Sequence, residues 1–204
     1  GRLSAFSYLN YAADLSDPKN TSFYQNISEK ISETSSHLVF CDIEINKISD
    51  KKLEEMLAES KKLAKYQPYL RDVRTFKKYQ LNEDLEKLFL EKSTTAKSAW
   101  SRLFDEIINN LKFPYQDKEL NSSEIFDLLS NSDEAVRKKA GKIIGNILGQ
   151  NSKILAFITN ILAKDKQTSD KWRKFKDPIS SRNLSNFIED DIVDNLFNKV
   201  KENY

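Results

Sequence analysis

The sequence predicts an all-α protein, a multi-helix array of long antiparallel helices. Only four glycines and four prolines occur in 204 residues, fewer than all-β or doubly wound folds usually need for their turns. Hydrophobic residues make up 39% of the chain, which is enough for a buried core and argues against disorder. Along most of the chain they recur every three or four residues, which is the period of an α-helix.

The first half of the chain predicts helices separated by polar turns. A first amphipathic helix carrying Leu3, Phe6 and Leu9 is expected to end at residues 16–18. Apolar residues then keep helical phase through residues 23–45, which predicts one long helix. Ser49 is expected to cap the next helix, and Asn82 opens another that the Ser/Thr cluster at 93–95 interrupts.

The cleanest helical pattern lies at residues 100–111. Apolar side chains occupy positions i, i+3, i+4, i+7, i+8 and i+11 without a miss: Trp100, Leu103, Phe104, Ile107, Ile108 and Leu111. This spacing predicts a helix with one apolar stripe. If that stripe faces the core, Trp100 is a core residue.

The period changes only at residues 111–120, where Leu111, Phe113 and Tyr115 alternate with Lys112 and Pro114. A short extended segment or hairpin is one interpretation of this alternation. Pro114 argues against a central strand, because proline has no backbone N–H to donate to a neighbouring strand.

The second half again predicts helices. Asn121 and Glu124 have the spacing of a capping box. The following helix carries Gly141, Gly145 and Gly149 on one stripe, which would let another helix approach closely. Helical patterns follow at 154–165 and 184–200, with a break at Asp177–Pro178 between them. We expect an amino-terminal helical lobe at 1–112 and a second helical lobe at 113–204, truncated at its carboxyl end, or one domain made of both.

Charge and cysteine usage limit the function classes. The 33 Lys and Arg against 31 Asp and Glu give a net charge of +2, too small for the basic face of a nucleic-acid-binding protein. The basic stretches 71–78 and 164–176 are interpreted as solvated helix surface. No apolar run reaches the roughly 18 residues that span a bilayer, so no membrane partner is expected. The single cysteine, Cys41, excludes an intramolecular disulfide, and a cytoplasmic location is the simplest expectation.

No catalytic, cofactor-binding or metal-binding residue is predicted. His37 is the only histidine, and a zinc site built from His37 and Cys41 would still need carboxylates that point elsewhere on the same helix. A partly buried histidine and a structural thiol are the expected roles. Adjacent acids such as Glu54–Glu55 or Asp190–Asp191 diverge by about 100° on a helix and cannot serve one substrate atom. The glycines form neither a phosphate loop nor a nucleophile elbow.

Residues 98–113, SAWSRLFDEIINNLKF, resemble a stretch in the amino-terminal part of the oligoendopeptidase F family of zinc metallopeptidases. Further segments resemble family landmarks in the same order: 69–74, 81–90, 132–140, 177–185 and 190–193. The resemblance therefore covers nearly the whole chain. It departs from the family at Asn183, where members often have histidine. The family's His-Glu-x-x-His helix and its downstream Glu ligand lie further toward the carboxyl end, and no position here matches them.

The resemblance implies a thimet-oligopeptidase-like architecture, a mostly helical body with a channel that admits short peptides. It implies that this chain is one wall of the channel, that the full-length enzyme holds zinc, and that this chain holds no cofactor and is inactive alone. The implied partners are the missing carboxyl-terminal catalytic portion and short peptides. A stand-alone helical adaptor that binds a protein partner is the alternative, and a nucleic-acid-binding helical domain is a third, weaker one.

Both ends of the sequence look cut. The chain begins with Gly1, and its last residues continue a helical pattern without a stop signal. The apolar stripe of the 184–200 helix is wider than one neighbouring helix usually covers. We therefore expect self-association through the 184–200 helix.

Overall fold

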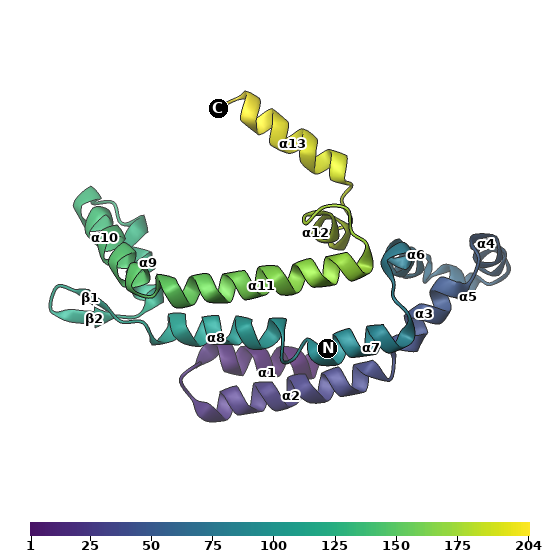
Figure 1. The fold of residues 1–204 in the computed structure, drawn as a ribbon, viewed down its shortest axis with the longest axis horizontal. Helices are drawn as coiled ribbons and strands as arrows, with labels where there is room; N and C mark the ends of the chain where they lie inside the picture. Colours follow the sequence, from purple (N-terminus) through teal and green to yellow (C-terminus); the bar gives the residue numbers. More distant parts are fainter. The chain divides into compact units, whose positions relative to one another are not determined.

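The computed structural model describes residues 1–204 without a gap, and its architecture is all-α with one two-stranded hairpin (Figure 1). The predicted fold class is thus confirmed, including the extended segment at 111–120. No helix combines the length and the apolar character that crossing a bilayer requires.

Backbone contacts divide the chain into two compact units. Unit 1 comprises Gly1–Glu33 and Lys92–Asp165, and unit 2 comprises Thr34–Glu91 and Lys166–Tyr204. Each unit is therefore built from two separate stretches of chain, whereas the predicted lobes 1–112 and 113–204 are contiguous. Those lobes, or one domain made of both, stay a prediction.

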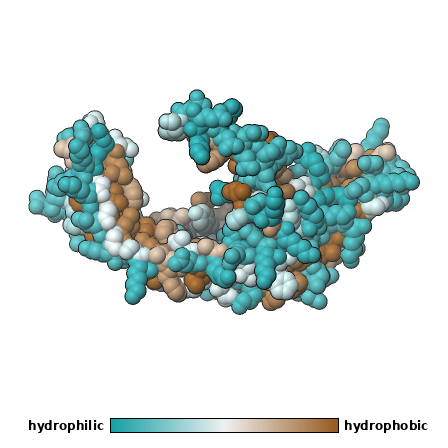
Figure 2. Space-filling view, turned by 45° about the horizontal axis from the view of Figure 1, so that its top comes forward, coloured by the Kyte–Doolittle hydropathy of each residue, from teal (hydrophilic) through white to brown (hydrophobic).

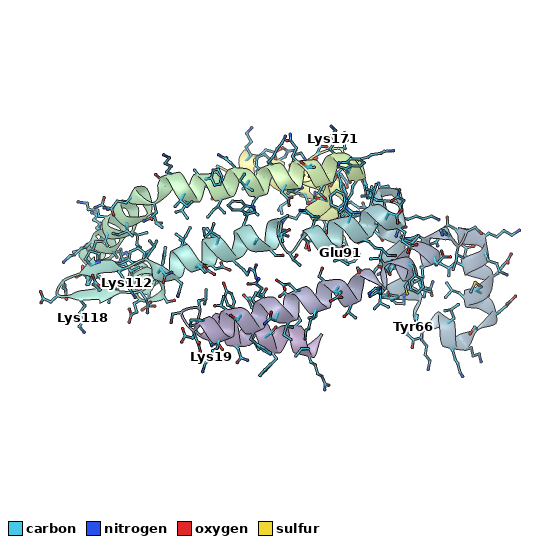
Figure 3. The ribbon with its side chains drawn as sticks, turned by 60° about the horizontal axis from the view of Figure 1, so that its bottom comes forward. Lys19, Tyr66, Glu91, Lys112, Lys118 and Lys171 are labelled. Carbon is cyan, nitrogen blue, oxygen red and sulfur yellow. The ribbon has the colours of Figure 1, made fainter.

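Unit 1 holds the hairpin and the longest helices. Its elements are α1 (Arg2–Ala13), most of α2 (Pro18–Ser36), α8 (Lys97–Asn110), β1 (Phe113–Tyr115), β2 (Lys118–Leu120), α9 (Ser122–Asp127), the 3-10 turn η2 (Leu128–Ser130), α10 (Glu134–Gln150) and the first part of α11 (Ser152–Arg173). Within the unit, α8 lies between α11 on one side and α2 on the other (Figures 1 and 3). Lys112 follows α8, and Lys118 lies in the hairpin (Figure 3).

The fully covered core of unit 1 lies where the hairpin meets α9 and α10. Its buried members are Phe113, Ile125, Ala140 and Ile144. Phe113 pairs with Leu120 in an antiparallel ladder that ends at Tyr115 and Lys118. The hairpin has no third strand, so Pro114 interrupts no central ladder. Gln116, with φ of 55°, makes the tight turn between the strands.

Unit 2 consists of shorter helices. They are α3 (Val39–Lys47), α4 (Asp50–Glu59), α5 (Lys61–Ala64), α6 (Gln67–Thr75), the 3-10 turn η1 (Lys77–Tyr79), α7 (Glu83–Lys92, whose last residue belongs to unit 1), the end of α11, α12 (Ser180–Ser185) and α13 (Asp190–Glu202). Figure 1 shows α13 leaving α12 at the carboxyl end of the chain.

The predicted helix caps are all present. The Ser49 hydroxyl accepts the Lys52 N–H at 3.2 Å, and the Asn82 side chain accepts the Leu85 N–H at 2.9 Å. Asn121 and Glu124 form a complete capping box, with reciprocal hydrogen bonds of 2.9 and 2.8 Å. Capping needs only neighbouring residues, which is why the sequence predicts it well.

Two of the predicted long helices are interrupted. The helix expected through 23–45 ends at Ser36 and resumes at Val39, with a turn that the Leu38 N–H closes on the Ser35 carbonyl at 2.9 Å. Serine and threonine side chains compete for backbone groups, and the run Thr34–Ser36 precedes this turn. The pattern expected through 184–200 is likewise split between α12 and α13. Conversely, the helix expected at 154–165 continues to Arg173.

Two expectations about helix faces were also wrong. The buried residues of α1 are Ser7 and Tyr11, while its apolar residues Leu3, Phe6 and Leu9 are exposed. Tyr11 is buried because its ring stacks on Tyr24, with centroids 4.9 Å apart. No helix packs closely on the glycine stripe of α10: a Cβ at Gly145 or Gly149 would meet nothing within 4 Å, and one at Gly141 would only touch the Leu129 side chain at 4.0 Å.

Candidate functional site

The residues considered for metal or nucleophile chemistry do not come together. His37 is exposed in the turn between α2 and α3, and Cys41 is exposed on α3, so the expected partly buried histidine and structural thiol were both wrong. The reason is the break at 37–38, which takes His37 off the helix that carries Cys41. No group of three or more His, Cys, Asp or Glu side chains could hold a metal ion. The residues of this chain therefore do not fit the zinc that the family resemblance implies for the full-length enzyme.

A bidentate ion pair joins α7 to the end of α11 in unit 2. The two Nη atoms of Arg173 donate to the two carboxylate oxygens of Glu86 at 2.8 and 2.7 Å. Arg173 also donates to the Tyr79 carbonyl at 3.3 Å and lies over the ring of Phe89. Burial favours the neutral form of Glu86, but hydrogen bonds from Arg173 and the Leu81 N–H outweigh it and lower the pKa of Glu86. Paired hydrogen bonds of this kind fix orientation as well as distance.

A second polar cluster joins α12 to the start of α13. The Ser180 hydroxyl and the Asn183 amide, both buried, donate to the two carboxylate oxygens of Asp190 at 2.9 and 2.8 Å. The hydrogen bonds from Asn183 and Ser180 lower the pKa of Asp190. Asp190 stands in the first turn of α13, where the helix dipole favours negative charge. The two segments of the cluster belong to the landmarks 177–185 and 190–193, and their hydrogen bonds anchor α12 to the start of α13.

The turn between α12 and α13 is a Schellman motif. The Ile188 N–H bonds to the Asn183 carbonyl and the Phe187 N–H to the Leu184 carbonyl, both at 3.0 Å. Phe187 occupies the left-handed position, with φ of 55°, where glycine is usual. Its ring is held edge-on against Phe76, with centroids 6.4 Å apart. This turn and the Asp190 cluster together set the direction in which α13 leaves α12.

The helix that these anchors hold has no covered face. None of its residues is buried, although its apolar side chains fall on one stripe about 140° wide at 100° per residue. The stripe consists of Ile192, Val193, Leu196, Phe197 and Val200. Leu196 and Phe197 are 66% and 65% exposed. Such a face can bind an apolar partner, and exposed patches of this kind mark interaction sites.

Each basic stretch contains a partly buried arginine that the sequence interpretation missed. Within 71–78, the Arg74 side chain is only 9% exposed, and its guanidinium donates to the Ile45 carbonyl at 2.8 Å and pairs with Asp50. Within 164–176, Arg173 makes the pair with Glu86 described above. The interpretation as solvated helix surface was therefore wrong for Arg74 and Arg173. A phenylalanine two residues after each arginine, Phe76 and Phe175, was the only sequence signal, because nearby aromatic rings can shield a guanidinium.

The predicted core position Trp100 is half-buried rather than buried. Its ring meets Phe157 of α11 edge-on, with centroids 5.7 Å apart. Figure 2 shows further apolar surface along the part of unit 1 that holds α9 and α10. Phe126 and Leu129 in that region are 43% and 39% exposed. Both units thus leave large apolar side chains in contact with solvent.

Three comparisons agree on what the chain is similar to. A family model described as oligopeptidase F matches residues 44–113. The oligopeptidase PepF of Bacillus subtilis is 22% identical over 214 residues, which cover 99% of this chain and 31% of that protein. The crystal structure of oligoendopeptidase-F from Enterococcus faecium superposes with a TM-score of 0.86 at 21% identity, covering 98% of this chain and 40% of that one.

The chain thus spans about a third of the length of the relatives it matches. The similarity extends over almost the entire chain, in agreement with the collinear motifs at 69–113, 132–140 and 177–193. The resemblance recognised from those motifs is confirmed: the chain is similar to the amino-terminal region of the oligoendopeptidase F peptidases.

Proposed function

We propose that this chain is the amino-terminal wall of a zinc-dependent oligopeptidase that hydrolyses short peptides inside a channel. The observation that carries the proposal is the superposition on oligoendopeptidase-F, which accounts for 98% of this chain and leaves most of the other protein unmatched. The proposed role of the wall is to limit the size of the peptides that enter.

Under this proposal the chain alone does not cut peptides. It has a single histidine, so a His-Glu-x-x-His motif cannot occur in it. In the full enzyme a zinc ion would activate water, with the motif glutamate as general base, and all of these ligands would come from the carboxyl-terminal portion. That portion and short peptides are the proposed partners. A cytoplasmic location and the absence of nucleic-acid and membrane partners complete the proposal.

A stand-alone helical adaptor is the second candidate, and the uncovered face of α13 is the observation in its favour. The two candidates differ in what the gene encodes after Tyr204. The peptidase proposal expects a His-Glu-x-x-His motif within the following few hundred codons. A stop codon directly after Tyr204 would support the adaptor instead.

A peptidase assay tests the functional claim itself. Quenched fluorescent peptides of several lengths are incubated with the 204-residue chain and zinc, and the Bacillus subtilis oligopeptidase PepF serves as the positive control. We expect no cleavage by the chain and no tightly held zinc after dialysis. Cleavage that a chelator abolishes, or one zinc bound per chain, would contradict the proposal.

A further inference from the structure

The two basic stretches of the sequence meet in unit 2. The Tyr79 ring, at the end of η1, stacks on the Phe175 ring just after α11, with centroids 3.9 Å apart. Arg173 adds a hydrogen bond to the Tyr79 carbonyl at 3.3 Å, although 94 positions separate the two residues in sequence. These contacts, together with the ion pair that holds the same guanidinium, fix residues 77–79 against residues 173–176.

The segments that meet there are rich in lysine. Together, residues 77–78 and 171–176 contain six basic residues and no acidic one. Arg173 is held by Glu86. Around the Tyr79–Phe175 stack stand four exposed lysines without an ion pair, which we call the lysine cluster: Lys77, Lys78, Lys174 and Lys176. A fifth exposed lysine, Lys171, lies one turn earlier near the end of α11 (Figure 3).

Lysines from both stretches act on the same region of space. Hydrogen bonds from Asn183 and Ser180 are the main causes that lower the pKa of Asp190, and the charges of Lys176 and Lys78 lower it further. The two lysines therefore lie close enough to one carboxylate to stabilise its charge. Because the lysine cluster brings four positive charges and Asp190 only one negative charge, an excess of positive charge remains. Such a local excess attracts anions.

The chemistry of the lysine cluster favours short, flexible anions. Its cations are all lysines, whose ammonium groups attract an anion as point charges and do not bind it in the bidentate manner of arginine. Asp177 and Asp191, which follow Lys176 and Asp190 in sequence, are exposed and would repel a long polyanion such as a nucleic acid. The net charge of the whole chain, +2, gives a long polyanion little attraction elsewhere. A short peptide with a few carboxylates matches such a local cluster.

We propose that the lysine cluster of unit 2 is a binding surface for acidic peptides, which it attracts by long-range electrostatics. The charge belongs to two internal segments and is independent of where the sequence ends. The inference deepens the proposed function, and the choice of a peptide as the anion rests on that function: the wall attracts acidic peptides in preference to neutral or basic ones. Attraction of this kind raises the association rate more than it slows dissociation.

Fluorescence anisotropy with labelled peptides tests the proposal on the 204-residue chain. The probes are short peptides on one Gly/Ser framework that carry glutamates, glutamines or lysines at the same positions. We expect the glutamate peptide to bind about ten times more tightly than the glutamine peptide at low ionic strength, and this preference to shrink as salt is added, because exposed charges are screened. The lysine peptide should bind most weakly. Equal binding of the glutamate and glutamine peptides would overturn the proposal.

A pair of matched variants locates the binding. Lys78→Gln with Lys176→Gln removes one charge from each stretch, and it should weaken binding of the glutamate peptide about fivefold, because exposed ion pairs contribute modestly. Lys19→Gln with Lys153→Gln removes the same charge from exposed lysines of unit 1 and should bind like the parent chain. Thermal melts followed by circular dichroism check that both variants keep the fold. Equal weakening in the two variants would overturn the proposal.

An oligonucleotide separates the alternative class of anion. A single-stranded oligonucleotide with the same charge as the glutamate peptide is measured in the same way and is expected to bind more weakly. Tighter binding of the oligonucleotide would overturn the proposal in favour of a nucleic acid. All of these readouts measure binding without cleavage, so their failure leaves the peptidase role intact. Cleavage of peptides by this chain alone would contradict the peptidase wall and leave the binding result standing.

Discussion

The α9–α10 region of unit 1 and the α13 helix of unit 2 carry the same kind of apolar stripe, yet only the first stripe is covered. Ile125 on α9 is fully buried against the hairpin and α10, whereas Ile192 on α13 is more than half exposed. The Asn121 cap of α9 was identified from the sequence, whereas the start of α13 at Asp190 was not, and both helices form. The difference lies in what packs on them, because the β1–β2 hairpin packs against α9 and α10, whereas within unit 2 it is α12 that packs against α13. An amphipathic pattern therefore predicts a helix but does not show whether its apolar face is covered.

The largest expected contrast is between two isoleucines. Ile125→Ala should lower the free energy of unfolding by about 2–5 kcal/mol, because it empties a fully covered position. Ile192→Ala should change it by about 0.5 kcal/mol or less when the chain is monomeric. Urea denaturation of both variants at low protein concentration measures the two values. Equal losses of unfolding free energy in the two variants would show that Ile192 on α13 is buried to the same degree as Ile125 on α9.

A smaller contrast is expected between two arginines of unit 2. It tests whether a partly buried ion pair contributes to the stability of unit 2, as the hydrophobic core does in unit 1. Arg173→Ala leaves Glu86 largely buried without its bidentate partner and should cost about 2–3 kcal/mol, somewhat less than a fully buried pair. Arg71→Ala removes an exposed pair with Asp72 and should cost about 0.5 kcal/mol or less. Thermal melts of the two variants supply the comparison. An Arg173→Ala variant as stable as Arg71→Ala would mean that the Glu86 pair does not hold α7 to α11.

Sequence reasoning predicted the parts of the fold that short-range interactions determine. The caps at Ser49, Asn82 and Asn121 depend on residues three positions away, and the helix at 97–110 follows from a stripe within itself. Collinear motifs identified the family, since they are properties of the chain and not of its packing.

Features that depend on distant contacts could not be predicted in the same way. Arg74 and Arg173 are charged and therefore appeared solvated, but carbonyls and carboxylates 24 to 94 residues away hold them. The breaks at His37 and at Phe187 fall inside patterns that keep helical phase on both sides, so periodicity did not reveal them. The candidate binding face was predicted as a stripe, whereas its separation from the preceding residues by a Schellman turn was not.

Hydrogen–deuterium exchange tests most directly whether the apolar stripe of the α9–α10 region is packed against other elements while that of α13 is exposed to solvent. At a protein concentration low enough to keep the chain monomeric, amides of α10 should be protected up to the stability of unit 1, because Ala140 and Ile144 anchor this helix in the core. Amides of α13 should exchange much faster, since the helix can open without uncovering any core residue. Protection of residues 190–202 equal to that of residues 134–150 in the monomer would contradict the account.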